Sequence, residues 1–462
     1  MRRGNPLEMK IFFAARSKYH FAYYETILEA LCARGHEVAY GFDAFWNGKG
    51  GGRQAFEAFE RAHTTGFSSF PLAVDGYDAR WLTHAHRYLA SLANYYMHPE
   101  QSEFYHERWA KKLPEAVRPF AEWRIIRWSL MLLHVLRVFS LLERLIPPPA
   151  PAVRQIEAAQ PDIVVVSPGN MRFGNEIDYI KAARKLGIPS AIPVLSWDNL
   201  STKGLICAEP DLVFCWNEMH RREARAFHDI PDGKLRITGA PFFEKWWGAG
   251  ETNNTPALPP DCGLDPQKPV LTYLGSSKRI TPDELWLVEE IYEGLQPLGV
   301  QLLVRPHPTD YERFSDMDAR EGLYVWMPHD SPPETAAAQA EMRRAFAASI
   351  GVIGINTSAF LDAIVLDVPC IIYMTDAYRN TQEEALHFQA LKTDMATIKI
   401  SDADELPAVL ADLAAGVDAT AAARKEFVEK FVFAGGRETP PGALIAHHLE
   451  KLAGRNRASV DA

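Results

Sequence analysis

Cysteine is scarce in this chain, and its cysteines stand far apart. There are five among 462 residues, and no two of them form a CxxC pair. An odd count without close pairs argues against a disulfide framework and against a structural zinc site. The sequence also lacks HExxH and any clustered His/Cys pattern, so we expect no metal ion and no bound cofactor. A reducing, cytoplasmic location fits these absences.

Three familiar catalytic signatures are also absent. The chain contains no GxGxxG, no GxxxxGK[ST] and no GxSxG. Nicotinamide enzymes, P-loop NTPases and serine hydrolases of the familiar kind therefore lose support. Positive charge is in deficit as well, because 49 Lys and Arg stand against 59 Asp and Glu, a net charge of −10 at pH 7. An acidic chain is a poor candidate for neutralising phosphate backbones, so we expect no nucleic-acid partner.

The longest apolar stretch is interrupted by charge. Residues 125–146, IIRWSLMLLHVLRVFSLLERLI, have the length of a membrane span but contain three arginines, a histidine and a glutamate. From Arg118 to Arg144 there are five arginines and two glutamates. Two interpretations stay open: an internal helix packed in its own domain, or a peripheral contact with an anionic membrane face, which would place the protein at the inner side of a membrane. The N-terminus reads as a first strand and not as a signal peptide.

Short apolar stretches alternate with helical ones along the chain. KIFFAA at residues 10–15 predicts a buried strand, residues 20–33 a helix, and EVAYGF at residues 37–42 a second strand. Further strands in the first half are expected at 161–169, 190–199, 211–217 and 234–241. This alternation indicates parallel sheets flanked by helices.

A segment rich in Gly, Pro, Thr and Asn divides the chain. We expect a linker at 249–265. Domain 1–248 is expected to carry a helical insertion at about 45–150, where the alternation breaks. Domain 266–462 repeats the alternation and closes with helices. The predicted fold class is α/β, with two Rossmann-like doubly wound domains facing a central cleft.

In the second half, groups suited to phosphate follow the strands. Arg305-Pro306-His307-Pro308 places a guanidinium and an imidazole on a turn that two prolines stiffen, and both groups can donate to phosphate oxygens. His307 is therefore a catalytic candidate. Ligands of doubly wound sheets bind at the carboxyl ends of strands, where this turn lies. The alternative is a surface turn with a solvated arginine.

Small polar residues follow two neighbouring strands of that half. Asn356, Thr357 and Ser358 open a helix, where free N–H groups favour an anion, although such residues are also ordinary caps. Asp362, one helical turn further on, is a candidate for ribose hydroxyls or merely complements the helix dipole. Gly275 and Ser276 also follow a strand, and Gly275 permits close approach of a ligand. Together these residues predict a nucleoside diphosphate site.

In the first half, Arg16, Ser17 and His20 follow the first strand. His20 is the candidate general base, because imidazole titrates near neutrality, and the alternative is an exposed helix residue. Asp198 is the rival base. Further polar or aromatic residues after strands are expected to line the acceptor site: Gly169, Asn170, Trp197, Asn199 and Lys203.

These motifs resemble a known group of enzymes. RPHP at 305–308, INTSAFLDAIVLDVPCIIY at 355–373, TGAP at 238–241 and the LSWDN segment are similar to the CDP-glycerol glycerophosphotransferase and surface-polysaccharide transferase group. The two halves with a central linker resemble the GT-B glycosyltransferase architecture. The resemblance implies that domain 1–248 holds the acceptor and domain 266–462 the nucleotide donor. It also implies that Arg305 and His307 contact donor phosphates, and that residues 356–358 contact the diphosphate.

The function that follows is a metal-independent transfer of a glycosyl or polyol-phosphate group to a glycan or lipid-linked acceptor. The nucleotide-activated donor is a substrate and not a cofactor. Non-hydrolysing UDP-N-acetylglucosamine 2-epimerases share the plan, so an epimerase is the first alternative. A non-catalytic protein of this fold that binds glycan or membrane is the second. The sequence names neither the nucleotide nor the acceptor.

Overall fold

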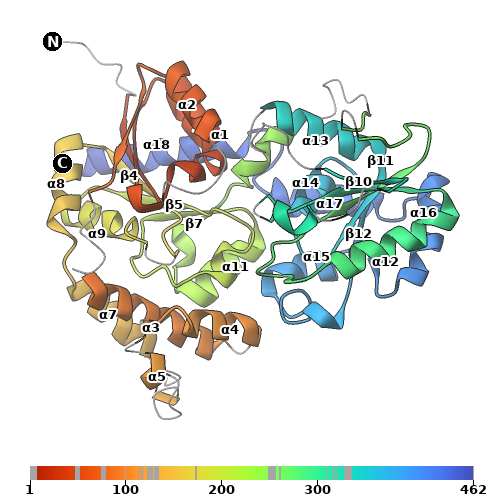
Figure 1. Ribbon diagram of the computed structural model, residues 1–462. Coiled ribbons are helices and arrows are strands. Elements are labelled where there is room, and N and C mark those ends of the chain that lie inside the picture. The colour runs from red at the N-terminus through yellow and green to blue at the C-terminus, as the bar shows by residue number, and fades with distance from the viewer. Residues whose placement is uncertain are drawn as a thin grey trace. The chain divides into compact units, whose positions relative to one another are not determined.

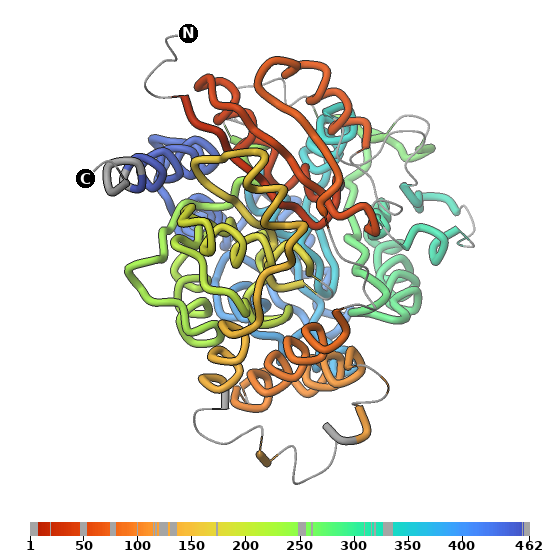
Figure 2. The backbone as a smooth tube through the Cα atoms, turned by 90° about the vertical axis from the view of Figure 1, so that its left-hand side faces the viewer, coloured from red at the N-terminus to blue at the C-terminus, as the bar shows by residue number. Residues whose placement is uncertain are grey.

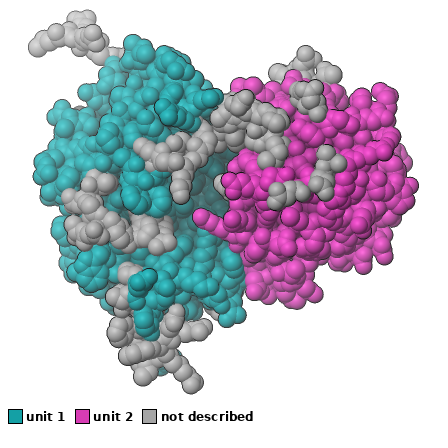
Figure 3. All heavy atoms as spheres, viewed as in Figure 1, with its two compact units in different colours: residues 1–244, 433–462 teal, residues 245–432 magenta. Residues whose placement is uncertain are grey.

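The chain forms two units, each built on its own sheet. The computed structural model describes residues 8–46, 53–73, 80–98, 100–113, 115, 118–121, 128–129, 135–171, 174–247, 256–259, 262–308, 310–315, 317, 320–326 and 336–460. Unit 1 comprises residues 1–244 and 433–462, and unit 2 comprises residues 245–432 (Figure 3). Most of the expected linker at 249–265 lies outside the described residues.

Unit 1 contains a seven-stranded sheet in the order β3-β2-β1-β4-β5-β6-β7. Every pairing in it is parallel. The strands are β1 Lys10–Ala15, β2 Glu37–Phe42, β3 Phe67–Pro71, β4 Ile163–Ser167, β5 Ser190–Pro193, β6 Leu212–Cys215 and β7 Leu235–Ile237. Strands β1 and β4 are buried nearly throughout, because helices cover both faces of a parallel sheet.

Helices flank this sheet, and the last helix of the chain returns to it (Figure 1). Those close to the sheet are α1 Glu25–Ala33, α2 Arg53–Ala62, α8 Ala150–Ala159, α9 Ile177–Lys185, α10 Asn199–Thr202, α11 Glu218–His228 and α18 Pro441–Val460. Ile445, Ala446 and Leu449 of α18 complete the core of unit 1. The compact units therefore differ from the expected domains, which assigned the closing helices to the second half.

A group of helices is inserted between β3 and β4. It contains α3 Trp81–Met97, α4 Glu103–Ala110, α5 Arg118–Ala121 and α7 Val135–Leu145. In Figures 1 and 2 these orange helices gather below the strands of unit 1. The sequence expectation of an insertion from about residue 45 began too early, because residues 67–71 pair with β2 as an edge strand. Residues 122–127 and 130–134 of the basic, apolar stretch lie outside the described residues.

Unit 2 repeats the plan with a six-stranded parallel sheet in the order β10-β9-β8-β11-β12-β13. Its strands are β8 Val270–Leu274, β9 Gln301–Arg305, β10 Leu323–Val325, β11 Ser349–Gly354, β12 Cys370–Tyr373 and β13 Ile398–Ile400. Its helices are α12 Leu285–Leu295, α13 Ala336–Ala348, α14 Ala359–Val365, α15 Gln389–Thr393, α16 Leu406–Ala414 and α17 Ala421–Phe427. The core lies between the sheet and these helices, with Leu302, Ile353 and Ile371 fully buried.

The strand orders confirm the predicted fold class of two Rossmann-like sheets. In each sheet the order reverses at one point, between β1 and β4 in unit 1 and between β8 and β11 in unit 2. Ligands of such sheets bind outside the carboxyl ends of the strands at this reversal. Among the described residues, no helix is both long enough and apolar enough to cross a membrane.

Candidate active site

In unit 2 the turn after β8 is pressed against the turn after β9. A Cβ atom on Gly275 would lie 2.9 Å from the backbone nitrogen of His307 and 3.1 Å from Cα of Pro306. The N–H of Gly275 donates to the carbonyl of Arg305 at 2.8 Å. Ser276 is fully buried, and its Oγ accepts from the N–H of Asn356 at 3.2 Å. Three predicted donor-site segments therefore meet at the strand reversal of this sheet.

A buried ion pair holds this turn in place. Glu284 accepts from the N–H of Ser276 at 2.9 Å and from the Tyr273 hydroxyl at 2.9 Å. The guanidinium of Arg313 pairs with Glu284 and also donates to the carbonyl of Ser276. Burial raises the pKa of Glu284 to about 7, although the charge of Arg313 opposes this shift. Sequence reasoning missed both residues, because neither follows a strand.

We expect the Glu284→Ala protein to be destabilised by roughly 3 kcal/mol, because the variant leaves the Arg313 cation without its buried partner. Urea unfolding of the variant and of the wild type measures this difference. The matched control is Glu289→Ala, whose ion pair with Arg320 is exposed and contributes about 0.5 kcal/mol at most. Equal losses in the two variants would contradict this account of the turn.

The β9 turn presents a cation that forms no ion pair among the described residues. The side chain of Arg305 is half-buried, and no described residue forms a hydrogen bond or ion pair with its guanidinium. Burial lowers the pKa of Arg305, and the charge of Asp362 opposes this shift. His307 lies 3.8 Å from Asp310, and burial lowers the pKa of its imidazole to about 4. At neutral pH this turn therefore offers one cation and one neutral imidazole.

The residues that open the helix after β11 differ in burial, and Asp362 within this helix is held by two neighbouring side chains. Asn356 and Thr357 are buried and Ser358 is exposed, and helix α14 behind them has only seven residues. Asp362 accepts from Nε1 of Trp246 at 2.7 Å and pairs with Lys245 at 3.0 Å. Its carboxylate thus fixes the segment before the expected linker. A contact of Asp362 with ribose stays a prediction.

In unit 1 the reversal between β1 and β4 gathers a second polar group. The N–H of Arg16 donates to the carbonyl of Ser167 at 3.2 Å, and the guanidinium of Arg16 stacks 3.9 Å from the Trp46 ring. Glu176 is fully buried, and neither of its carboxyl oxygens has a hydrogen-bond partner among the described residues. Burial raises the pKa of Glu176 to about 7 against the opposing charge of Arg16. Sequence reasoning missed Glu176.

His20 lies on the 3-10 turn Lys18–Tyr23, and Ser17 directly precedes this turn. The sequence predicts an α-helix from residue 20, but helix α1 begins at Glu25. The carbonyl of Ser17 accepts from the N–H of His20 at 3.3 Å. Nδ1 of His20 is buried and has no hydrogen-bond partner among the described residues. Burial and the charge of Arg16 lower the pKa of His20 to about 3. The ring is therefore neutral at physiological pH, with one nitrogen unprotonated.

The polar residues after β4 and β5 bind one another. Asn170 donates to the carbonyl of Asn199 at 2.9 Å, and Asn199 donates back to Oδ1 of Asn170 at 2.7 Å. Asp198 accepts from Ser196, from Thr202 at 2.8 Å and from Lys203 at 2.6 Å. These side chains tie two turns together and have little capacity left for a ligand. The expectation that they bind the acceptor, or that Asp198 is a base, is not what this geometry favours.

Trp197 and Gly169 are also packed closely by their neighbours. Trp197 is only 5% exposed, so its ring does not offer an open face to a sugar, and its backbone carbonyl lies 3.0 Å from Nε2 of His220. Gly169 has a positive φ of 75°, and a Cβ there would lie 2.9 Å from Ile192. The insertion supports this region, because Trp109 Nε1 donates to the carbonyl of Thr202 at 3.2 Å.

A buried carboxyl beneath these turns makes stability depend on pH. Burial and, as a smaller contribution, the charge of Asp198 raise the pKa of Glu223 to about 8. A folded-state pKa above the ordinary value of 4.5 means that stability is full below pH 4.5 and is lost as pH rises toward 8.

We therefore expect Glu223→Gln to reduce the loss of stability between about pH 5 and pH 8 by on the order of 2 kcal/mol. Urea unfolding of the variant and of the wild type at pH 5 and pH 8 measures the loss of unfolding free energy in each protein. Parallel pH dependence in variant and wild type would show that Glu223 does not titrate in this range.

Comparison with known proteins places this geometry in a known architecture. No protein-family model matches the chain, and no curated protein sequence matches it. Solved structures do. The UDP-GlcNAc 2-epimerase from Methanocaldococcus jannaschii matches with a TM-score of 0.53 at 12% identity, over 96% of this chain and 100% of that chain. CalG4, the calicheamicin glycosyltransferase, matches with a TM-score of 0.50 at 11% identity, over 98% of this chain and 99% of that chain. The chain has the GT-B fold. At these identities the likeness concerns the fold alone.

Proposed function

We propose that this protein transfers a glycosyl or polyol-phosphate group from a nucleotide-activated donor to an acceptor hydroxyl, without a metal ion. Unit 2 binds the donor and unit 1 the acceptor. The observation that carries the proposal is the guanidinium of Arg305, which forms no ion pair with a described residue and is held on a stiff turn beside Gly275 and Ser276 at the strand reversal of unit 2. The chemistry of such a site fits a diphosphate.

In this proposal each site residue has a defined task. Gly275 lets the turn after β8 pack against the turn after β9, while Arg305 donates to phosphate oxygens and His307 contributes one N–H as a neutral ring. The bond between the donor's transferred group and its leaving phosphate breaks, and the electron pair stays on the leaving oxygen. Arg305 stabilises that charge. His20 accepts the proton of the acceptor hydroxyl as the new bond forms.

Among candidate donors, we place a CDP-polyol beside nucleotide sugars. The support is the sequence resemblance of residues 305–308 and 355–373 to the CDP-glycerol glycerophosphotransferase group. Glycan or lipid-linked hydroxyls are the acceptor class of that group. The fold similarity does not choose among these donors, because one fold carries many functions.

An epimerase is the second candidate. Its specific support is the fold similarity to a UDP-GlcNAc 2-epimerase, with a TM-score of 0.53. An epimerase changes a UDP-sugar in the absence of any acceptor, whereas a transferase needs one. Incubation of UDP-N-acetylglucosamine with the protein alone, followed by product chromatography, separates the two.

A thermal-shift screen tests the donor assignment first. The protein is heated with UDP, CDP, GDP, ADP, CMP or TDP, without added metal. A nucleotide at about 100 times its dissociation constant adds about 2.7 kcal/mol, and the unfolding midpoint rises visibly. The hit is then tested as an activated donor with candidate acceptors. If the folded protein responds to none of these nucleotides, the donor site proposed here is wrong and the non-catalytic alternative gains support.

A further inference from the structure

Helix α7 of the insertion carries an apolar stripe that faces solvent. Val138, Leu141, Leu142 and Leu145 recur at helical spacing and are 44–70% exposed. A solvent-facing stripe of this kind is uncommon on a soluble helix, which normally turns its apolar side inward. We call these four residues the α7 stripe.

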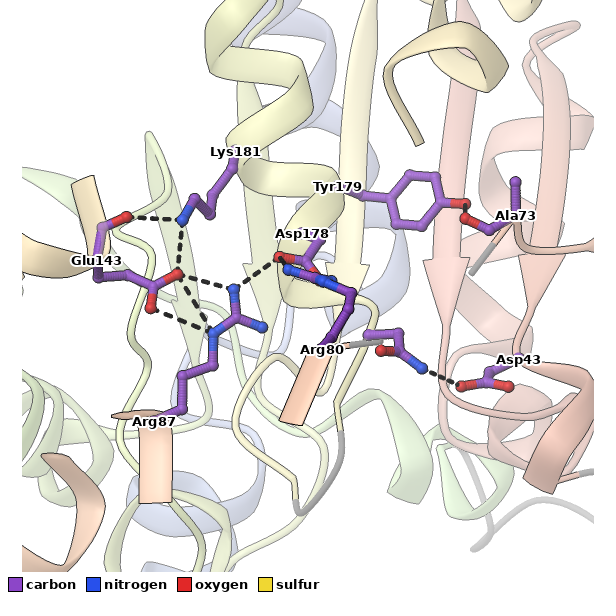
Figure 4. A network of polar contacts seen from close by, with 9 residues as sticks. Asp43, Ala73, Arg80, Arg87, Glu143, Asp178, Tyr179 and Lys181 are labelled. Atoms are coloured by element: carbon purple, nitrogen blue, oxygen red, sulfur yellow. Dashed lines mark hydrogen bonds and ion pairs between the residues drawn. The ribbon is translucent and has the colours of Figure 1, made fainter. Parts of the chain in front are cut away.

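A buried ion network fixes the rotation of α7 and so forces the stripe outward. Glu143, on the opposite side of the helix, is 3% exposed and accepts from Arg87 at 2.7 Å and from Lys181 at 2.7 Å. Arg87 also donates to Asp178 at 2.6 Å, so the network joins α3, α7 and α9 (Figure 4). Burial would raise the pKa of Glu143, yet Arg87 and Lys181 hold it below its ordinary value. A rotated helix would leave these buried charges unpaired.

The charges that flank the stripe are cationic. Glu143 is the only acid on α7, and it is buried and neutralised, whereas Arg137 and Arg144 are exposed. Arg144 has only a long contact of 3.9 Å with Glu209. The exposed surface of α7 therefore combines leucine and valine with positive charge alone. This is the pattern of helices that lie in an anionic membrane interface.

A cavity of about 470 Å³ opens beside the same helix. Side chains of α7, of the loop at 205–209 and of the last turn of α9 contribute to its lining. Leu141 and Arg144, which belong to the exposed surface of α7, also line it. Arg184 and Lys185 add two further cations. The volume lies in the range of sites for small ligands. The lining mixes apolar side chains and cations with the acids Glu143, Glu209 and Asp229, of which Glu143 is paired with Arg87 and Lys181.

This surface is separate from the proposed acceptor site. Helix α9 begins at the carboxyl edge of the sheet after β4, so its last residues lie at the opposite edge, and residues 205–209 precede β6. The candidate residues Arg16 and His20 follow β1 at the carboxyl edge. Changes to the α7 stripe therefore leave the proposed chemistry untouched.

We infer that α7 is a membrane-docking helix, and that unit 1 binds the surface of a bilayer containing anionic lipid through the α7 stripe and its flanking arginines. A second copy of the chain fits this surface poorly. A two-fold contact would bring Arg137 and Arg144 of both copies together without acids on α7 to pair with them. The inference stands apart from the donor site, although a lipid-linked acceptor would give the docking a purpose.

Vesicle flotation with the full chain tests this inference. One set of vesicles contains equal parts of phosphatidylcholine and phosphatidylglycerol, and the other contains phosphatidylcholine alone. We expect wild type to float with the anionic vesicles only. Arg137→Gln/Arg144→Gln should lower the partition coefficient by roughly thirtyfold, and Leu141→Ser/Leu145→Ser by at least about tenfold. The control is Met395→Ser/Val417→Ser, two exposed apolar residues of unit 2, which should float like wild type.

The altered side chains are exposed, so the unfolding midpoints of all variants should match that of wild type. Failure of wild type to float, equal binding to neutral vesicles, or unchanged binding of both α7 variants overturns the inference. A wild-type dimer that the leucine variant converts to monomer in light scattering also overturns it, in favour of a second copy. Nucleotide thermal shifts measured without vesicles report on the proposed function separately.

Discussion

Replacing Arg305 by alanine is expected to lower kcat/KM for the activated donor by about 10²- to 10³-fold. The reason is that Arg305 has no ion-pair partner among the described residues, and the other phosphate donor of the β9 turn, His307, is neutral at pH 7 because burial lowers its pKa to about 4. The nucleotide-induced thermal shift should shrink in parallel. Steady-state kinetics and the shift together measure the effect.

The controls for Arg305 separate charge, geometry and folding. Arg305→Lys keeps the charge but loses the two-pronged contact, so it should recover only part of the activity. Arg379→Ala removes an exposed arginine of the same unit, with a side chain 55% exposed, and should behave like wild type. A fully active Arg305→Ala protein would remove the donor site from this turn.

Replacing His20 by glutamine is expected to lower kcat by about 10²- to 10⁴-fold, the usual contribution of a general base. Donor binding should not change, because His20 belongs to unit 1 and the donor residues belong to unit 2. Rapid-quench or steady-state turnover at saturating donor measures the loss, and the unfolding midpoint confirms that the variant is folded.

The pH profile distinguishes His20 from an ordinary histidine. Its pKa is lowered to about 3, so the proton-accepting form persists well below the ordinary value of 6.5. We expect the acidic limb of kcat/KM to lie below about pH 5. An acidic limb of kcat/KM near pH 6.5 that disappears in the His20→Gln protein would contradict this expectation. It would show that His20 titrates at its ordinary pKa and is therefore not buried as described. Asp198→Asn should instead lower stability, because Asp198 pairs with Lys203 at 2.6 Å.

The sequence was a good guide to the buried strands. β1, β2 and β4 could be predicted because a parallel strand buried on both faces reads as a short apolar run. Strand β3, FSSFP, could not, because an edge strand has fewer neighbours and needs fewer apolar residues. The return of α18 to unit 1 also escaped prediction. Its packing on α1 depends on the close approach of Gly442 to Thr26, a long-range contact without a local signal.

The contacts among the candidate site residues could not be predicted from the sequence, and the assignment of these residues to a ligand stays a prediction. The sequence shows which polar residues follow strands, but it does not tell whether such residues bind a ligand or each other. Asn170 and Asn199 bind each other, and Asp198 is held by Lys203. Glu176 and Glu284 were missed because an acid at the start of a helix reads as an ordinary dipole contact. Only burial, which follows from tertiary packing, sets them apart.

Photo-crosslinking tests the central claim, a nucleoside diphosphate site at the strand reversal of unit 2, most directly. The protein is irradiated with an azido analogue of the nucleotide found in the screen, digested, and mapped by mass spectrometry. The account predicts labelled peptides containing residues 275–277, 305–307 or 356–358. It also predicts that excess unlabelled nucleotide abolishes the labelling and that Arg305→Ala strongly reduces it. Labelling confined to unit 1, or labelling that unlabelled nucleotide does not displace, would contradict the account.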